Sequence, residues 1–237
     1  MRLGGGLGYK TPTVFTEDAE RIQFRNVLPL DLTTVEAEKS IGSNFDINYR
    51  TPIGENISFS INTLLFYTKV SNPIILTPIS DHYQFLQPKG YLDTKGVEAN
   101  IKLSFHDFKL FVGYTLADVN EHYNDTTTQF PLVAKHRLNN VLMYEIEEKL
   151  KIGLEAYYFS PQLLNDRTTG QDYWICGFMV EKLWEHFSIF INFENFLDTK
   201  QTDFDMIYTG SITNPIFRDI YAPVDGFVIN GGIKIRL

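Results

Sequence analysis

The chain has 237 residues, of which 43% are hydrophobic, and it carries a formal net charge of −8 at pH 7. Because a nucleic-acid partner requires clustered Lys and Arg, this acidic balance excludes nucleic acid as a partner. The single cysteine, Cys176, excludes an internal disulfide, whereas 19 Phe and 13 Tyr beside 2 Trp favour strands over helices.

Apolar and polar residues alternate along most of the chain, which predicts strands with one apolar and one polar face. In residues 40–50, Ile41, Phe45, Ile47 and Tyr49 alternate with neighbours that are almost all polar. We predict ten strands in chain order, at residues 2–9, 40–50, 57–69, 97–105, 108–119, 135–147, 149–160, 172–183, 185–197 and 227–237. The strand at 172–183 is apolar on both faces, so we expect its inner side to contact another part of the protein.

The connections between these strands alternate in length. Short turns are expected at 53–56, 106–107, 148 and around 184, and long loops at 11–39, 70–92, 120–134, 161–171 and 198–225. Most segments have the length that a tilted strand needs to cross a bilayer, and half of each is polar, so the absence of a long apolar run does not count against spanning. The pattern predicts an all-β, antiparallel transmembrane β-barrel with its long loops outside the cell.

Three short motifs carry a resemblance to a known family. Residues 2–12 (Arg-Leu-Gly-Gly-Gly-Leu-Gly-Tyr-Lys-Thr-Pro) resemble the stretch of TonB-dependent receptors in which a barrel strand rises into an extracellular loop. Residues 30–47, with Glu36 and Gly42, resemble the segment by which that loop returns to the barrel, although no Pro precedes the Glu. Residues 191–198 (Ile-Asn-Phe-Glu-Asn-Phe-Leu-Asp) resemble the penultimate barrel strand as it ends.

The end of the chain resembles the signal that the outer-membrane assembly machinery reads. The residues that carry this signal are Asn230, Gly232, Ile235 and Leu237. Residues 1–10 lack the basic region and apolar run of a signal peptide, so we expect the chain to be a fragment of an outer-membrane protein.

The resemblance implies that residues 1–237 are the C-terminal portion of the β-barrel domain, about ten strands of an expected 22, without the plug domain. It implies an outer-membrane receptor and transporter for a scarce nutrient such as a ferric siderophore, cobalamin or haem, energised by TonB through the plug. The implied partners are the TonB system, outer-membrane lipid, the assembly machinery and a small nutrient ligand. No enzymatic activity and no cofactor are expected. The alternative is an autonomous ten-stranded outer-membrane barrel that acts as an enzyme or an adhesin.

Two sets of site residues follow from the expected loops and faces. Exposed aromatic and histidine side chains in long loops suit a flat or sugar-like ligand, and the candidates are Tyr83, Phe85, Tyr91, His122, Tyr123, Phe130, Tyr208 and Phe217. Polar side chains that alternate with apolar ones should face the lumen, and the candidates are Glu98, Lys102, Lys109, Glu155, Asn192, Glu194, Lys234 and Arg236.

Other chemistry finds little support in the sequence. Gly4, Gly5, Gly6 and Gly8 are followed by no Lys-Ser/Thr pair and no helix, so we expect them to leave room for something packed on the inner wall rather than to bind phosphate. The five histidines lack metal-ligand spacing, and no catalytic motif is present, so neither a metal site nor a catalytic site is predicted.

Overall fold

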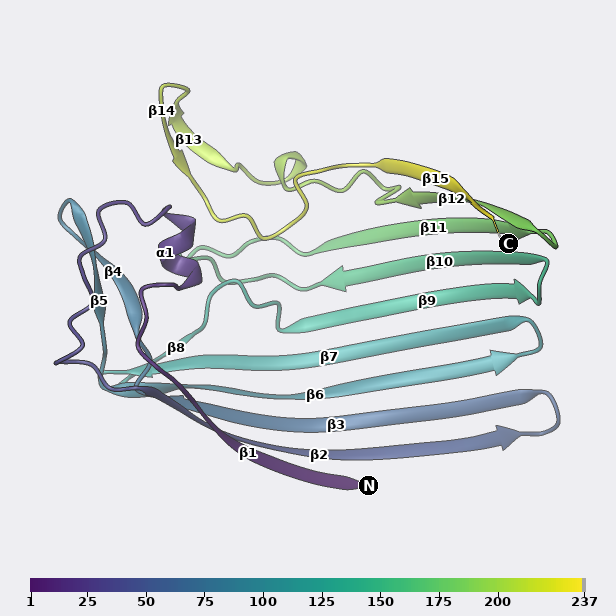
Figure 1. Cartoon of the computed structure of the whole chain (residues 1–237), viewed down its shortest axis with the longest axis horizontal. Coiled ribbons are helices and arrows are strands. Elements are labelled where there is room, and N and C mark those ends of the chain that lie inside the picture. The colour runs from purple at the N-terminus through teal and green to yellow at the C-terminus, as the bar shows by residue number, and fades with distance from the viewer. Residues whose placement is uncertain (236–237) are drawn as a thin grey trace.

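Ten long strands form one antiparallel sheet in the computed structural model, which describes residues 1–235 (Figure 1). Each strand pairs with its neighbours in chain order, and the short strand β8 (Thr126–Gln129) adds to the end of β7. The ten are β1 (Arg2–Lys10), β2 (Glu38–Ile53), β3 (Ile57–Ser71), β6 (Gly90–Phe105), β7 (Phe108–Tyr123), β9 (His136–Ile146), β10 (Leu150–Phe159), β11 (Tyr173–Leu183), β12 (Phe187–Glu194) and β15 (Val228–Ile235).

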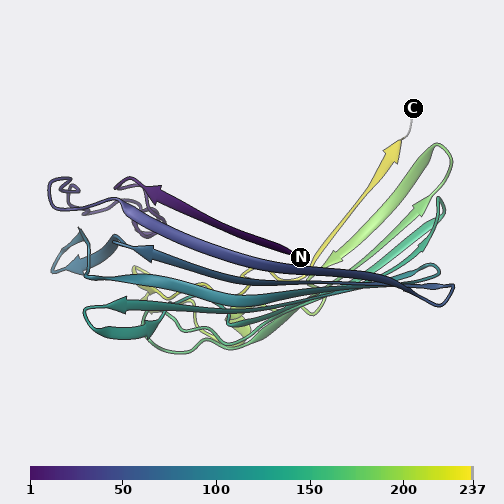
Figure 2. The same ribbon diagram turned by 90° about the horizontal axis from the view of Figure 1, so that it is seen from below.

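The sheet is strongly curved and open, with β1 at one edge and β15 at the other (Figures 1 and 2). The predicted all-β antiparallel architecture is confirmed, as a partial barrel. Short turns join β2 to β3, β6 to β7, β9 to β10 and β11 to β12 at one end of the sheet, and the long connections gather at the other end. The expected alternation of short and long connections is therefore present.

Several strands extend further toward the loop end than the apolar pattern predicts. β6 begins at Gly90 rather than at 97, and β7 continues to Tyr123. Asp93 and Lys95 lie on the same face of β6 as Val97, so the apolar alternation stops there while the backbone pairing with β7 continues. Backbone pairing needs no apolar side chain, which is why the sequence pattern underestimated these strands.

The long loops contain structure of their own. Residues 11–37 hold the short helix α1 (Glu17–Arg21). Its N-cap is Thr16, whose hydroxyl accepts a hydrogen bond from the Ala19 N–H. Hairpins form from β4 (Ile75–Ile79) with β5 (His82–Leu86) and from β13 (Tyr208–Ser211) with β14 (Asn214–Phe217). The 3-10 helix η1 (Gln201–Asp203) precedes the second hairpin.

The strand register sorts the side chains onto two faces of opposite character. Asn48, Asn62 and Asn100 are direct neighbours across β2, β3 and β6, and the same row continues through Gly113 to Asn139. One residue away, the register aligns Ile61, Ile101 and Val112 on the other side. We call these the polar face and the apolar face. The main buried apolar cluster lies at the loop end of the sheet, and it consists of Leu164, Tyr173, Tyr221 and Ala222.

Among residues 1–235, no helix has the length and apolar content to cross a membrane.

Candidate functional site

The asparagine row is the most regular feature of the polar face. Asn48, Asn62, Asn100 and Asn139 flank a groove of about 600 Å³ that Tyr157 and Lys102 also line. Gly113 interrupts the row where a Cβ would lie only 3.0 Å from the Asn100 Oδ1 atom. Because each carboxamide both donates and accepts hydrogen bonds, the row forms a strip of uncharged hydrogen-bonding groups across five strands.

Charged groups on the polar face are paired near the turn end. The Lys109 Nζ lies 2.5 Å from a Glu145 carboxylate oxygen, and the Lys151 Nζ lies 3.1 Å from the other oxygen. On the last strands, the Lys234 Nζ lies 3.0 Å from Glu181, which also accepts a hydrogen bond of 2.8 Å from the buried Ser188 hydroxyl. These networks hold their charges on one side of the sheet, away from the apolar face.

The structure places seven of the eight predicted lumen residues on the polar face, in separate groups. They are Glu98, Lys102, Lys109, Glu155, Asn192, Glu194 and Lys234, whereas Arg236 lies outside the described residues. Glu155 accepts a hydrogen bond of 2.7 Å from the Tyr157 hydroxyl, and Asn230 connects Glu194 to Asn192 through its side chain. Their assignment to a lumen stays a prediction.

A second groove, of about 470 Å³, lies along β11, the strand with apolar residues on both faces. Ile175 and Met179 of β11 line it on the polar face together with Glu155 and Glu194. Gly153 on β10 makes room for the Met179 side chain, since a Cβ there would lie 3.2 Å from Met179 Cγ. On the polar face, β11 thus presents an apolar strip between carboxylates.

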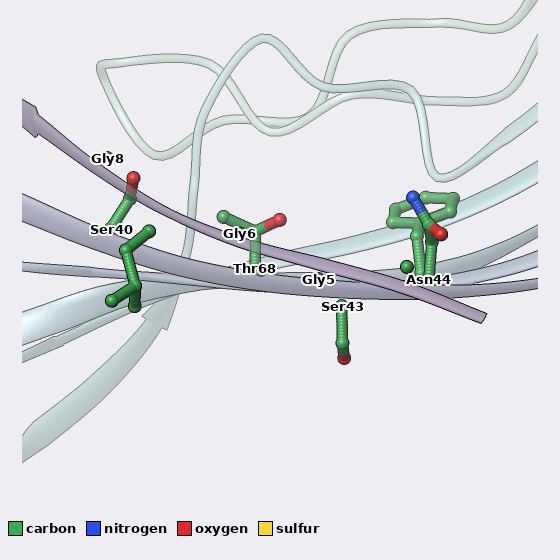
Figure 3. A pocket seen from close by; sticks show the side chains of 11 residues that line it. Gly5, Gly6, Gly8, Ser40, Ser43, Asn44 and Thr68 are labelled. Atoms are coloured by element: carbon green, nitrogen blue, oxygen red, sulfur yellow. The ribbon is translucent and has the colours of Figure 1, made fainter.

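The glycines of β1 border a third groove on the polar face, of about 610 Å³. Figure 3 shows Ser40, Thr68 and Asn44 pointing to one side of the sheet and Ser43 to the other. A Cβ at Gly8 would lie 2.7 Å from Ser40 Oγ, whereas a Cβ at Gly6 would meet no atom within 4 Å. A side chain at Gly8 would therefore displace the Ser40 hydroxyl, whereas the described part of the chain places no steric demand on Gly6.

At the loop end, one buried amide joins the two ends of residues 198–225. The Gln201 side chain is fully buried, donates to the Asp219 carbonyl at 2.8 Å, and accepts from the Tyr221 and Ala222 N–H groups at 2.8 and 3.1 Å. The Tyr173 hydroxyl donates to the Tyr221 carbonyl at 2.7 Å, which ties the loops to the start of β11. We call this assembly, centred on Gln201 and Tyr221, the loop base.

The surroundings of Tyr221 complete the loop base. The Tyr221 ring packs over Gly170, where a Cβ would lie 2.6 Å from the ring, and its hydroxyl donates to Asp205 at 3.2 Å. Burial raises the pKa of this hydroxyl above its usual value. Arg218 bridges the two loops by ion pairs of 2.7 Å to Asp205 and 3.3 Å to Asp166.

The segment quoted for the penultimate strand acts as a clamp at the end of β12. Asn195 and Asp198 both have positive φ, of 48° and 55°, a conformation that Asn and Asp tolerate better than most residues. The Asn195 side chain bonds the Thr199 backbone and the Asp225 carbonyl, and Asp198 accepts the Phe227 N–H at 2.9 Å. The Lys200 ammonium and then the Phe227 N–H hold the pKa of Asp198 below its usual value.

The other end of the loop region is tied by the segment that contains Glu36. The Gln87 side chain donates to the carbonyls of Glu36 and Asn72, and the Glu36 carboxylate accepts from the Asn72 side chain at 3.0 Å. The Tyr83 backbone pairs with Asn26 and Leu28. The loop at 70–92 is therefore joined to the loop at 11–37.

The predicted ligand-contacting residues do not form one cluster. Phe85 is only 6% exposed, so the premise of an exposed ring is wrong there, because the β4–β5 hairpin packs it inward. Tyr91, His122 and Tyr123 lie in the extended parts of β6 and β7 rather than in loops, and Tyr91 stacks on the His122 ring at 4.4 Å.

Tyr208 and Phe217 face each other in the β13–β14 hairpin and are 48% and 72% exposed. The Phe130 N–H bonds the Val119 carbonyl, which draws this residue back to the end of β7. The hairpin lies between the two segments of the loop base. Three residues of this region, Gln201, Arg218 and Tyr221, were not predicted as site residues, because they follow no periodic pattern in the sequence.

Of the predicted assembly signal, Asn230, Gly232 and Ile235 lie in β15, and Leu237 lies outside the described residues. Among residues 1–235, no group of three or more His, Cys, Asp and Glu side chains is arranged to hold a metal ion.

Comparison with known proteins gives one consistent result. The family described as "TonB dependent receptor-like, beta-barrel" matches residues 8–196. No curated protein matches the sequence.

Solved structures match the fold at low identity. The FrpB iron transporter from Neisseria meningitidis is 12% identical with a TM-score of 0.64, and 98% of this chain covers 36% of that one. P. aeruginosa FpvA bound to heterologous pyoverdines is 15% identical with a TM-score of 0.65, and 98% of this chain covers 30% of that one. The copper transporter OprC is 12% identical with a TM-score of 0.69, again with 98% and 36% coverage. The chain thus spans about a third of the length of these proteins.

Proposed function

Because the chain belongs to the TonB-dependent receptor β-barrel family, we propose that it forms part of the wall and the outer loops of a transporter that imports a scarce nutrient. Members of this family lie in the bacterial outer membrane, and they are receptors rather than enzymes. The apolar face then contacts lipid, the polar face lines the lumen, and the loop end faces the exterior. TonB would supply the energy through a plug domain that residues 1–237 do not include.

The open sheet supports the proposal that the chain is one portion of a larger barrel. Unpaired N–H and C=O groups in hydrocarbon cost several kcal/mol each, so β1 and β15 each need a partner strand in a membrane. In a closed ten-stranded barrel these two strands would pair with each other, yet they lie at opposite edges of the sheet. This weighs against an autonomous ten-stranded enzyme or adhesin and favours a larger barrel, for which the family resemblance implies about 22 strands.

The single observation that carries the ligand-binding role is the exposed hairpin on a well-bonded base. Tyr208, Ile216 and Phe217 are exposed on β13–β14, while Gln201 and Tyr221, in the segments that flank the hairpin, are buried and hydrogen-bonded to each other. Large exposed apolar side chains on a rigid support are typical of binding sites. Since similar structures are described as an iron transporter, a ferripyoverdine receptor and a copper transporter, we propose a metal chelate as the nutrient, with cobalamin and haem as further candidates.

The test replaces Tyr208 and Phe217 with Ser in the full-length protein. Uptake of ⁵⁵Fe-loaded siderophores, cobalamin and haem should fall at least tenfold for one member of the panel, while the amount of assembled protein stays constant. The control replaces Ser211 and Thr213 of the same hairpin with Ala, and its uptake should match that of the wild type. If the variant with Ser at 208 and 217 imported every nutrient of the panel as well as the control variant does, the proposed role of the hairpin would be contradicted.

A further inference from the structure

The segment that carries the β13–β14 hairpin contains no charged residue. Residues 206–217 read Met-Ile-Tyr-Thr-Gly-Ser-Ile-Thr-Asn-Pro-Ile-Phe, whereas 21% of the whole chain is charged. The two strands pair only with each other, and among the described residues no hydrogen bond or ion pair joins 208–217 to another part of the chain. The hairpin projects at the loop end (Figure 1), so the polar contacts that orient it must lie at its foot.

The first charged residues on the two sides of this segment form one ion pair. Asp205 precedes the segment and Arg218 follows it, and the Arg218 Nη1 atom lies 2.7 Å from the Asp205 Oδ1 atom. The Arg218 N–H also donates to the Ile207 carbonyl at 3.0 Å. The backbone and the side chain of one residue thus close the foot of the hairpin.

The same guanidinium also reaches the loop at 161–171. Its Nη2 atom lies 3.3 Å from the Asp166 Oδ2 atom and donates to the Thr168 hydroxyl at 3.1 Å. The other oxygen of Asp166 accepts from the N–H and the hydroxyl of Thr168, and the Leu164 N–H donates to the Thr168 carbonyl. The tip of this loop is therefore ordered by its own bonds. Because the donors of a guanidinium form a rigid planar fork, Arg218 can hold the hairpin and the loop at a fixed angle.

The position of Arg218 distinguishes it from the other contacts between these segments. The Arg218 side chain is 23% exposed and that of Asp205 is 18% exposed, so water screens their ion pair less than it screens a fully exposed one. Asp219 accepts hydrogen bonds from the Asn165 N–H and side chain at 2.7 and 2.9 Å, but it follows the foot of the hairpin. Arg218 directly follows Phe217, so its bridge lies nearest in sequence to the exposed rings.

We propose that Arg218 is a positioning residue for ligand capture. By fixing the hairpin against the loop at 161–171, it holds the exposed rings of Tyr208 and Phe217 in the orientation that binds the nutrient, without touching the nutrient itself. A surface that is ordered before the ligand arrives loses less conformational freedom on binding, so its affinity is higher. The inference rests on the proposed function, which assigns ligand binding to this hairpin.

The first experiment measures uptake by cells that carry the full-length protein. The probes are a ⁵⁵Fe-loaded hydroxamate siderophore, a ⁵⁵Fe-loaded catecholate siderophore, cobalamin and haem. For the probe that the wild type imports, Arg218→Gln should raise the half-saturating concentration about tenfold and leave the maximal rate unchanged, because only capture is weakened. Asp166→Asn removes the bridge to the loop but keeps an oxygen for Thr168, and it should raise this concentration about threefold.

The matched control for these variants is Arg167→Gln. It removes a positive charge from the same loop, but Arg167 pairs with Glu121 and not with the foot of the hairpin. Its half-saturating concentration should stay within about twofold of that of the wild type. An increase as large as that of Arg218→Gln would overturn the proposal, since loss of charge alone would then explain the effect.

A double variant and a conservative variant separate the bridge from misfolding. If Asp166 acts through Arg218, then Arg218→Gln/Asp166→Asn should raise the half-saturating concentration no further than Arg218→Gln alone. Arg218→Lys keeps the charge without the fork, so its value should fall between those of the wild type and Arg218→Gln. Additive effects in the double variant, or a lower maximal rate at an unchanged half-saturating concentration, would contradict a positioning role.

The second experiment needs no ligand. Spin labels at Ile212→Cys in the hairpin and at Thr126→Cys on β8, in a Cys176→Ala background, would report the distances between the hairpin and the wall by double electron–electron resonance. The distance distribution should widen in Arg218→Gln and not in Arg167→Gln, and equal widths would overturn the proposal. If the distribution widens as expected but the wild type imports none of the four probes, the proposed function fails while the support of the hairpin by Arg218 stands.

Discussion

The strand wall and the loop base are stabilised in different ways. In the wall, most strands repeat the same arrangement, with apolar side chains on one face and polar groups such as Asn62 and Lys102 on the other. In the loop base, a single side chain, Gln201, satisfies three backbone groups of the facing segment. Many weak, equivalent contacts tolerate the loss of one, whereas a site centred on one residue does not. The following changes test that difference.

Gln201→Leu should have the largest effect, and it should be confined to the loop base. The substitution removes the hydrogen bond to the Asp219 carbonyl and leaves the Tyr221 and Ala222 N–H groups buried without partners, at about 4 kcal/mol in total. Amide exchange in residues 198–225 should then accelerate by more than about 100-fold, with exchange in β6 and β7 unchanged. The control is Gln171→Ala, which removes one exposed hydrogen bond to the Phe204 carbonyl. Faster exchange throughout the sheet would mean that the base and the wall unfold together.

A charge on the apolar face should destabilise the wall almost as much. Ile101→Arg near the bilayer midplane should cost about 2 to 4 kcal/mol of folding free energy, whereas Lys102→Glu on the polar face should cost far less. Refolding of the full-length protein into lipid vesicles over a range of urea concentrations would measure both. Equal costs at these adjacent positions would show that the two faces of β6 do not differ in environment.

Adding one methyl group should lower the stability of the loop base more than that of the strand wall. In Gly170→Ala the new Cβ would lie 2.6 Å from the Tyr221 ring, so we expect a loss of about 1 to 3 kcal/mol in the stability of the loop base. In Gly6→Ala the new Cβ meets no atom within 4 Å, so thermal unfolding should be unchanged within about 0.5 kcal/mol. A marked loss with Gly6→Ala would instead reveal an element that packs on β1 in the full-length protein.

The smallest expected effect is on pH dependence. The pKa of Asp198 is lowered by Lys200 and the Phe227 N–H, and that of Asp166 is lowered by the Thr168 hydroxyl and N–H. Groups with a lowered pKa contribute stability above their ordinary value of 3.8, and this contribution is lost as the pH falls through the lowered pKa. Amide exchange near Thr168 and Phe227 should therefore rise, relative to that in β7, when the pH is lowered from 6 to about 3. No relative change would show that these carboxylates do not hold the loops.

The wall was predictable from the sequence and the loop base was not. Period-two alternation identified the ten strands and the separation of Ile101 from Lys102, because a bilayer imposes one character on each face. It failed at Asp93 and Lys95, where the backbone pairing with β7 continues beyond the apolar stretch of β6. Gln201 and Tyr221 carry no periodic signal, because their role depends on a fold of two distant loops. Asn195 and Asp198 were within a recognised motif, although only the structure shows that they clamp the strand ends.

That clamp has a consequence for the order in which the last strands form. β12 and β15 are separated by a long loop, and closing such a loop costs conformational entropy before any pairing compensates for it. Asn195 and Asp198 bind Asp225 and Phe227 directly, so the two strand ends meet as soon as these few residues find each other. Once this contact has formed, β15 can pair with β12 residue by residue, as in a tight hairpin, whatever the length of the loop that connects the two strands. Insertions in residues 202–217 should accordingly slow the folding of the last strand very little, so the length of that loop can vary without loss of the strand pairing.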